Sequence, residues 1–154
     1  MILDIQHIDP QRIAAIDSNG AKLRYAEINL PSQRITSIIP TRSLCFLLVE
    51  NNVGGIAWVM SMLDSQQLVP LILNAKTENA LYQQLLNTYQ PTYICAPNHF
   101  AVEGEVVDCQ YEYTLTKVSN STPALHNELS HLLPTSGSTG SPKLVRHKYD
   151  NIDA

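Results

Sequence analysis

Apolar and polar positions follow two kinds of spacing between residues 44 and 96. Continuous apolar runs at 44–49 and 68–73 indicate strands that are buried on both faces of a sheet. Residues 55–63 and 76–89 carry apolar side chains at helical spacing, which predicts two helices. A third short run at 92–96 completes the order strand, helix, strand, helix, strand. This order predicts a βαβαβ unit with right-handed crossovers.

The first forty residues predict a hairpin followed by a short helix. Residues 12–17 and 22–28 have the pattern of two strands on either side of Asn19-Gly20, a pair that tolerates the positive φ of a tight turn. Pro31 fits the first turn of a helix that continues to Ile38.

Beyond residue 100 the pattern indicates strands. We expect one or two antiparallel strands within 106–118, and further strands at 128–135 and 143–147. Because proline cannot donate a ladder hydrogen bond, we expect Pro70 to occupy a bulge or an edge-like position. The predicted fold class is α/β: a partly parallel sheet flanked by helices, with an N-terminal β-hairpin, in a single domain over residues 1–154.

The amino-acid composition narrows the class of partner and the cellular compartment that we expect for the protein. Only 16% of the 154 residues are charged and the formal net charge is −4, which argues against a nucleic acid polymer as partner. No apolar stretch approaches the roughly 20 residues of a membrane span, and no signal peptide is visible. Cys45, Cys95 and Cys109 fit no disulfide framework and no zinc pattern. We therefore expect a cytoplasmic protein with reduced cysteines and no membrane association.

One polar segment, residues 132–143 (LLPTSGSTGSPK), stands apart from the rest of the chain. Glycines let a backbone approach a ligand closely, and successive N–H groups in such a turn form an anion-binding nest. Lys143 adds a compact positive charge suited to a phosphate. The segment is neither Gly-x-x-x-x-Gly-Lys-Ser/Thr nor Gly-x-Gly-x-x-Gly. Its chemistry predicts a loop that wraps the phosphates of a nucleotide.

The order Thr-Ser-Gly-Ser-Thr-Gly-x-Pro-Lys in this loop resembles the phosphate-loop signature of the adenylate-forming (AMP-binding) ligases. These include acyl-CoA synthetases, the adenylation domains of peptide synthetases, and luciferases. Residues 44–73 and 93–97 also resemble the early region of those enzymes. The family commonly has glycine after the lysine, where this chain has Leu144. The resemblance implies that the nucleotide phosphates contact Thr135, Ser136, Gly137, Ser138, Thr139, Gly140 and Lys143.

The same resemblance implies an activity. Family members activate a small-molecule carboxylic acid with ATP and Mg²⁺, which gives an acyl-adenylate and pyrophosphate, and a thiol of CoA or of a carrier protein then takes the acyl group. Their catalytic lysine and adenine-binding segments follow the phosphate loop and have no counterpart here. We therefore expect an N-terminal fragment of a longer ligase, with no catalytic or metal-binding residue of its own. The remainder of the ligase chain would be its partner, and the isolated chain would be inactive.

Other candidate sites have simpler interpretations. The segment Asn51-Asn52-Val53-Gly54-Gly55 could bind a second phosphate at a helix N-terminus, but we favour a helix cap with glycines that allow close packing. His126, His131 and His147 match no metal-ligand spacing and are expected on the surface. Asp108 and Glu112 are expected on a solvated strand face, and Trp58 in the core.

Two further functions stay open beside the ligase fragment. The chain could be a stand-alone module that binds nucleotide phosphates without catalysis. It could also be an interaction module, because exposed sheet edges invite self-association and the charged fraction is low.

Overall fold

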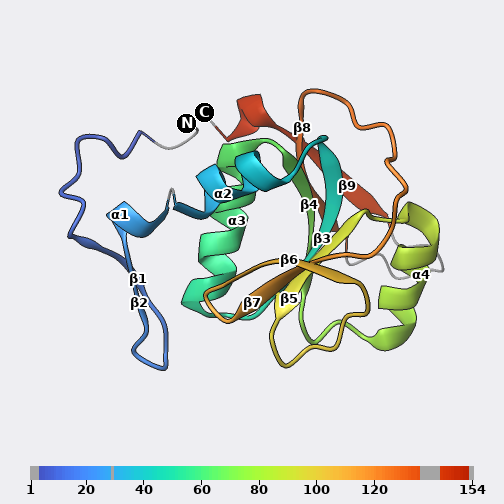
Figure 1. Cartoon of the computed structure of the whole chain (residues 1–154), viewed down its shortest axis with the longest axis horizontal. Helices are drawn as coiled ribbons and strands as arrows, with labels where there is room; N and C mark the ends of the chain where they lie inside the picture. Colours follow the sequence, from blue (N-terminus) through green and yellow to red (C-terminus); the bar gives the residue numbers. More distant parts are fainter. Residues whose placement is uncertain (1–3, 29, 136–142, 153–154) are drawn as a thin grey trace.

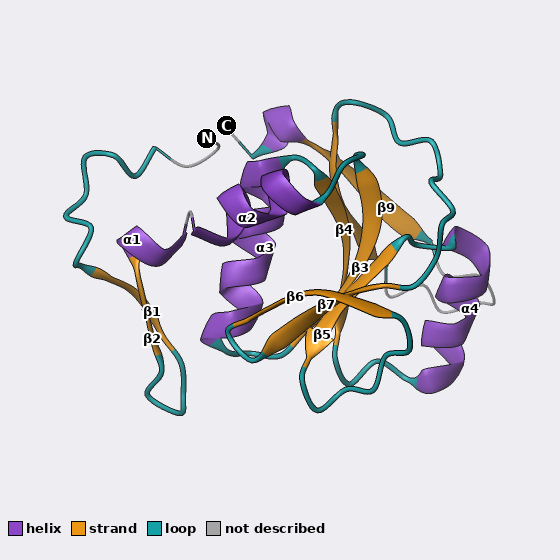
Figure 2. Cartoon of the chain, in the orientation of Figure 1, coloured by secondary structure: helices purple, strands orange, loops and turns teal. Residues whose placement is uncertain are grey.

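The computed structural model describes residues 4–28, 30–135 and 143–152. Figures 1 and 2 show a central twisted sheet with helices on both faces and a separate two-stranded hairpin beside it. In spatial order the sheet contains β6 (Glu105–Gln110), β7 (Tyr113–Lys117), β5 (Tyr93–Pro97), β3 (Ser43–Val49), β4 (Leu68–Asn74), β8 (Leu129–Pro134) and β9 (Leu144–Lys148). Strands β5, β3, β4 and β8 are parallel, and each outer strand is antiparallel to its neighbour. The predicted α/β class and partly parallel sheet are confirmed.

The predicted βαβαβ unit forms the centre of the sheet. Strand β3 leads into α3 (Val53–Ser65), β4 into α4 (Asn79–Tyr89), and β5 completes the unit. All residues of β3 except Val49 are buried, as its unbroken apolar run requires. Helix α4 begins later than the periodicity predicts, because the Asn74 side chain accepts a hydrogen bond from the Lys76 N–H (2.8 Å) and holds a turn there.

The expected bulge or edge position at Pro70 is wrong. Strand β4 lies between β3 and β8, and its parallel register with β3 is unbroken from Ser43↔Leu68 to Val49↔Asn74. Pro70 itself is buried. Burial of the apolar residues on both faces of β4 outweighs the one hydrogen bond that proline cannot donate.

Two cores lie on opposite faces of the sheet. Helix α2 (Leu30–Ile38) and α3 cover one face, where Trp58 and Met62 of α3 pack on Cys45 of β3. Trp58, Met62 and Cys45 are all fully buried. Helix α4 covers the other face, where Leu85 packs against Phe46 and its neighbours. Cys45 and Cys95 are buried free thiols, as the sequence predicts, and burial raises the pKa of both.

The predicted N-terminal hairpin is confirmed, although its second strand is shorter than expected. Strands β1 (Ile13–Ile16) and β2 (Lys22–Arg24) flank a turn in which Gly20 has φ +82°. The chain then enters α1 (Tyr25–Ile28), because the Glu27 carboxylate accepts a hydrogen bond from the Arg24 N–H at 2.7 Å. A glutamate that reaches back to the residue before a helix is one half of a capping box. Among the described residues, no helix is long and apolar enough to cross a membrane.

Candidate functional site

The carboxyl ends of four parallel strands meet at one edge of the sheet. Val49 of β3, Asn74 of β4, Pro97 of β5 and Pro134 of β8 are the last residues of these strands. In open α/β sheets, ligands bind beyond this edge. The predicted phosphate loop leaves the sheet here, since it follows β8 and returns as β9. The fold therefore positions the loop where a sheet of this kind binds a ligand.

The neck of the loop is closed by paired hydrogen bonds. Thr135 donates to the Lys143 carbonyl twice, from its backbone N–H at 2.8 Å and from its Oγ1 hydroxyl at 2.9 Å. Directly below, Pro134 of β8 lies opposite Leu144 of β9 in antiparallel register. Thr135 and Lys143 are both exposed, and no carboxylate of the described residues forms an ion pair with Lys143. The Lys143 ammonium is thus available to an anion at the mouth of the loop.

Of the phosphate-binding residues predicted from the sequence, the structure describes Thr135 and Lys143. The remaining members of the set, Ser136, Gly137, Ser138, Thr139 and Gly140, lie outside the described residues.

The hairpin that carries the loop has a second feature, a stacked pair of histidine rings. His131 of β8 and His147 of β9 face each other in register, with ring centroids 4.4 Å apart and planes within 3°. Ser130 Oγ lies 2.9 Å from His131 Nδ1 and donates to the His147 carbonyl at 3.0 Å. Burial, and secondarily the nearby His147, lower the pKa of His131 below its usual 6.5. The sequence shows two separate histidines, and only strand register brings them together.

The other glycine-bearing turn at this edge is filled by the protein's own groups. Asn52 caps α3, and its Oδ1 accepts from the Gly55 N–H at 2.9 Å. Asp17 of the N-terminal hairpin accepts from the Val53 N–H at 3.2 Å. That hydrogen bond, the largest cause, together with those from Ala21 and Asn19, lowers the pKa of Asp17. A carboxylate already occupies this helix N-terminus, which favours the cap over a second phosphate site.

Gly54 and Gly55 in this turn are needed for close packing. A Cβ built on Gly54 would lie 2.4 Å from the Tyr111 carbonyl oxygen and 2.6 Å from the Tyr113 ring. A Cβ on Gly55 would lie 2.6 Å from the Glu50 carbonyl oxygen. The interpretation of these glycines as packing residues is confirmed.

A polar network that the sequence does not suggest connects this turn to β7 and β5. The buried Tyr113 donates its hydroxyl to Asn52 Oδ1 at 2.9 Å and accepts from the Glu50 N–H at 3.0 Å. His99, which follows β5, forms an ion pair with the Glu50 carboxylate. Tyr113 is far from residue 50 in sequence, so no local signal could have identified the network.

The expectation that Asp108 and Glu112 share a solvated face is wrong. Asp108 is 6% exposed and pairs with Arg34 of α2 at 2.7 Å. Burial opposes its charge, but hydrogen bonds from Arg34 and Gln110 outweigh burial and lower the pKa of Asp108. Glu112 lies in the β6–β7 turn, where Tyr111 and Glu112 have φ of 52° and 62°. The apolar pattern of β6 did not indicate that a helix packs beside Asp108.

No group of three or more metal-ligating side chains occurs within residues 4–28, 30–135 and 143–152. His126, one of the three histidines considered from the sequence, is exposed on the loop before β8.

The fold is that of the first part of the N-terminal domain of adenylate-forming ligases. One solved structure that shares it is o-succinylbenzoate CoA synthetase (MenE) from Bacillus subtilis in complex with the acyl-adenylate intermediate OSB-AMP. The TM-score is 0.66 with 19% identity, over 94% of this chain and 40% of MenE. Apo MatB from Rhodopseudomonas palustris matches with a TM-score of 0.64 and 18% identity, over 97% of this chain and 33% of MatB.

A third similar structure is the Klebsiella oxytoca NpsA N-terminal subdomain in complex with 3-hydroxybenzoyl-AMSN. It has a TM-score of 0.61 and 18% identity, over 91% of this chain and 38% of that chain. This protein therefore spans 33–40% of the length of these structures. No protein-family model and no curated protein matches the sequence.

Proposed function

We propose that this chain supplies the nucleotide-phosphate-binding part of an ATP-dependent ligase that activates a carboxylic acid as its adenylate. In this reaction a carboxylate oxygen attacks the α-phosphorus of ATP, a new C–O–P linkage forms, and pyrophosphate leaves. A thiol of CoA or of a carrier protein is the proposed final acceptor. Buried unpaired Cys45 and Cys95 fit a reducing compartment, so the cytoplasm is the proposed location.

One observation carries the proposal. A loop with the order Thr-Ser-Gly-Ser-Thr-Gly-Ser-Pro-Lys begins at the carboxyl end of a parallel strand, in a fold that adenylate-forming ligases share. Neither the loop sequence nor the fold would suffice alone, because hydroxyl-rich loops are common and one fold hosts many activities. Together, the loop sequence and its place in the sheet support phosphate binding.

The proposed role of the loop is to hold the β- and γ-phosphates during attack on the α-phosphate. Thr135, Ser136, Gly137, Ser138, Thr139 and Gly140 would donate hydrogen bonds, and Lys143 would offset part of the phosphate charge. Catalysis of phosphoryl and adenylyl transfer is mostly positioning and charge stabilisation. The paired hydrogen bonds at Thr135 serve this role, because they fix both ends of the loop before a ligand arrives.

Magnesium would enter this site with ATP. The described residues offer no cluster of ligating side chains for a resident ion. The hydroxyl, backbone and lysine groups of the loop fit a nucleotide whose phosphates already coordinate Mg²⁺. The ion would then offset phosphate charge while the loop fixes the position of the phosphates.

Calorimetric titration with ATP, with and without Mg²⁺, tests the proposal. We expect saturable binding by the 154-residue chain, weakened roughly 10- to 100-fold by Lys143→Ala, because a charge-assisted hydrogen bond contributes about 1.5–3 kcal/mol. Lys22→Ala, on the exposed β2 strand, is the matched control and should bind as the parent does. Equal affinity of all variants, or absence of binding, would overturn the proposal for the isolated chain.

We further propose that the 154 residues do not complete the reaction unaided, since they span only 33–40% of the similar structures. Exchange of labelled pyrophosphate into ATP, measured with a panel of carboxylic acids, should stay at the level of a protein-free blank. Acid-dependent exchange by the purified chain would contradict this. The remainder of the ligase would be supplied by further polypeptide.

Self-association is a second candidate, favoured by the two edges of the sheet. Among the described residues, β6 pairs only with β7 and β9 only with β8, and their Val106 and Val145 are 64% and 42% exposed. Unpaired edges of this kind invite pairing with another strand. Sedimentation at increasing concentration should reveal oligomers, and a monomer at every concentration would exclude this candidate.

A further inference from the structure

A cavity of about 350 Å³ lies on the α4 face of the sheet, beside the hairpin that carries the phosphate loop. Helix α4 covers β3 and β5 on this face, whereas residues 119–128 pass over β8 and β9 (Figure 1). The cavity lies between these two coverings. Its apolar walls include Tyr89, Leu125, Leu129, Leu132 and Leu144. Its volume falls within the range of small-molecule sites, which is roughly 300–1,000 Å³.

The outer wall is held in place by hydrogen bonds from Arg42 and Thr92, which do not line the cavity. Arg42 donates to the His126 carbonyl at 3.0 Å and to the Leu129 carbonyl at 2.5 Å. Thr92 Oγ1 donates to the Ser121 carbonyl at 2.5 Å, near the start of the same loop. Both ends of the covering loop are therefore fixed to the sheet, and the cavity is preformed rather than opened by a ligand.

A bulge in β8 provides the apolar floor. The register with β9 shifts between Leu129 and His131, so Leu129 and Leu132 both face the cavity although they are three residues apart. The intervening Ser130 is fully buried and donates to the His147 carbonyl. Bulges commonly redirect side chains in this way near binding sites.

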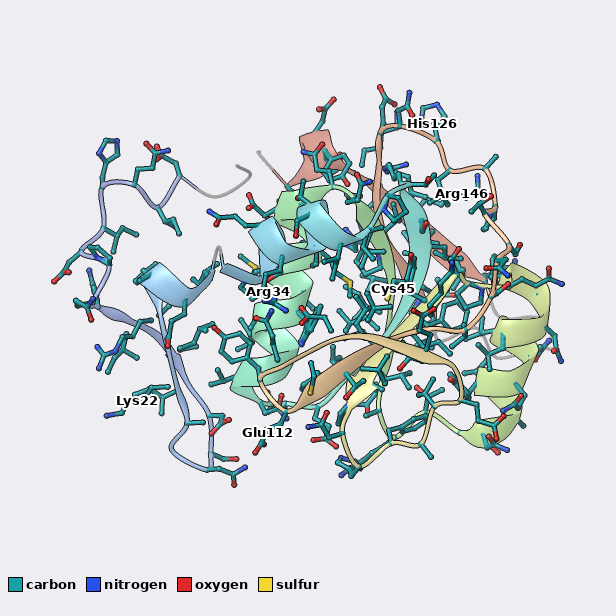
Figure 3. The ribbon with its side chains drawn as sticks, viewed as in Figure 1. Lys22, Arg34, Cys45, Glu112, His126 and Arg146 are labelled. Carbon is teal, nitrogen blue, oxygen red and sulfur yellow. The ribbon has the colours of Figure 1, made fainter. Side chains whose placement is uncertain are left out.

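The guanidinium group of Arg146 lies at the rim of the cavity. Arg146 of β9 lines the cavity and is exposed, and no carboxylate of the described residues pairs with it. Glu128, the residue before β8, is paired with Lys148 at 2.8 Å. Figure 3 shows Arg146 and His126 on the same side of the molecule, toward the covering loop. Guanidinium groups bind carboxylates with two parallel hydrogen bonds.

We propose that this cavity binds a small monocarboxylic acid with an apolar body. The acyl or aryl part would fill the leucine-lined space, and the carboxylate would pair with Arg146. Apolar burial and one charge-assisted contact match the common design of ligand sites. The proposal is independent of nucleotide binding, because none of the wall residues named here belongs to the predicted phosphate-binding set.

Saturation-transfer NMR with phenylacetate, in the absence of nucleotide, tests the proposal. Phenylacetamide keeps the ring without the charge, and acetate keeps the charge without the ring. We expect both to bind at least about tenfold more weakly than phenylacetate, because each lacks one of the two contacts. Phenylacetate should shift backbone resonances of β8, β9 and residues 119–128.

Variants separate this site from the phosphate loop. Arg146→Gln should weaken phenylacetate about tenfold and leave phenylacetamide unchanged. Ala124→Phe, which fills the cavity from the exposed covering loop, should abolish binding of both. Lys143→Ala should bind phenylacetate normally even though ATP binding is expected to fall. Absence of phenylacetate binding, or binding that Arg146→Gln and Ala124→Phe leave unchanged, would overturn the proposal.

Discussion

Two polar, glycine-bearing turns follow strands at the same edge of the sheet, and their described residues differ in the partners that they contact. Residues 50–55 follow β3 and lead into a helix, whereas residues 135–143 follow β8 and lead into another strand. In the first turn, Asp17 and Asn52 accept from the N–H groups of Val53 and Gly55, and Tyr113 donates to Asn52. The second is joined at its neck by Thr135, and its lysine has no described anionic partner. Similar composition therefore serves packing in one place and ligand binding, as we propose, in the other.

The difference has a physical basis. At the first turn, an acceptor from within the protein lies close to the N–H donors of the helix N-terminus. A helix N-terminus presents unpaired N–H groups and a positive dipole end, which attract any nearby carboxylate. The β1–β2 hairpin brings Asp17 to that place at Val53, so an external phosphate would have to displace an internal anion. We infer that the first turn has a structural role. Replacing its residues should lower the free energy of unfolding before it changes the affinity for ATP.

From this inference, Gly54→Ala is expected to have the largest effect on stability of the variants proposed for the two turns. The added Cβ would meet the backbone oxygen of Tyr111 at 2.4 Å, where nothing flexible can yield. We expect the free energy of unfolding to fall by about 1–3 kcal/mol, the usual cost of overpacking, as measured by urea denaturation.

Ile56→Ala is the matched control for Gly54→Ala, because Ile56 lies on the same helix and is 46% exposed. It should change stability by about 0.5 kcal/mol or less. Folded Gly54→Ala protein should bind ATP as the parent does. A specific loss of ATP affinity with unchanged stability would mean that the first turn also binds phosphate.

The next effect concerns the neck of the second turn. Thr135→Val removes the hydroxyl hydrogen bond to the Lys143 carbonyl and keeps the backbone one. We expect a loss of about 0.5–1 kcal/mol in stability, because the residue is exposed, and a several-fold weaker affinity for ATP in calorimetry.

Thr88→Val on α4 is the matched control, since its hydroxyl also donates to a backbone carbonyl, at 2.8 Å. It should resemble Thr135→Val in stability and the parent in ATP affinity. If the two variants bind ATP equally, the neck has no role in holding the loop for a ligand.

Much of this contrast could be predicted from the sequence, because local signals carry it. The apolar runs of β3 and β4 specify buried parallel strands, and asparagine before an apolar helix specifies the cap at Asn52. The Thr-Ser-Gly loop between two strands is recognisable without any contact information. Glu27, which ends β2 early, was also a local signal, since it lies where a capping-box glutamate belongs.

Tertiary contacts account for what the sequence could not predict. Asp108 has the pattern of a solvated strand residue, but its side chain is buried and α2 brings the exposed Arg34 against it. His131 and His147 become stacked only through the register of β8 and β9. Pro70 fails as a local signal for a related reason, because the strands on both sides of β4 decide its position. None of these partners lies close in sequence to the residue that it affects.

The smallest expected effect is a difference between the pH ranges in which the β8–β9 hairpin and the first turn lose stability. Burial and His147 lower the pKa of His131, so near pH 6.5 the unfolded chain binds more protons than the folded one. The free energy of unfolding therefore falls as pH drops below 6.5. The pKa of Asp17 is also lowered, chiefly by the Val53 N–H, so near pH 3.8 the folded chain binds fewer protons. Its contribution is kept at pH 5 and is lost only in stronger acid.

Urea denaturation at pH 7.5, 5.5 and 3.5 distinguishes the two regions. His131→Gln should lose less stability than the parent between pH 7.5 and 5.5, whereas His7→Gln, an exposed control, should follow the parent. Asp17→Asn should differ from the parent by a constant amount over that interval, and the difference should shrink at pH 3.5. If both variants deviate from the parent over the same pH interval, the β8–β9 hairpin and the first turn do not lose stability independently.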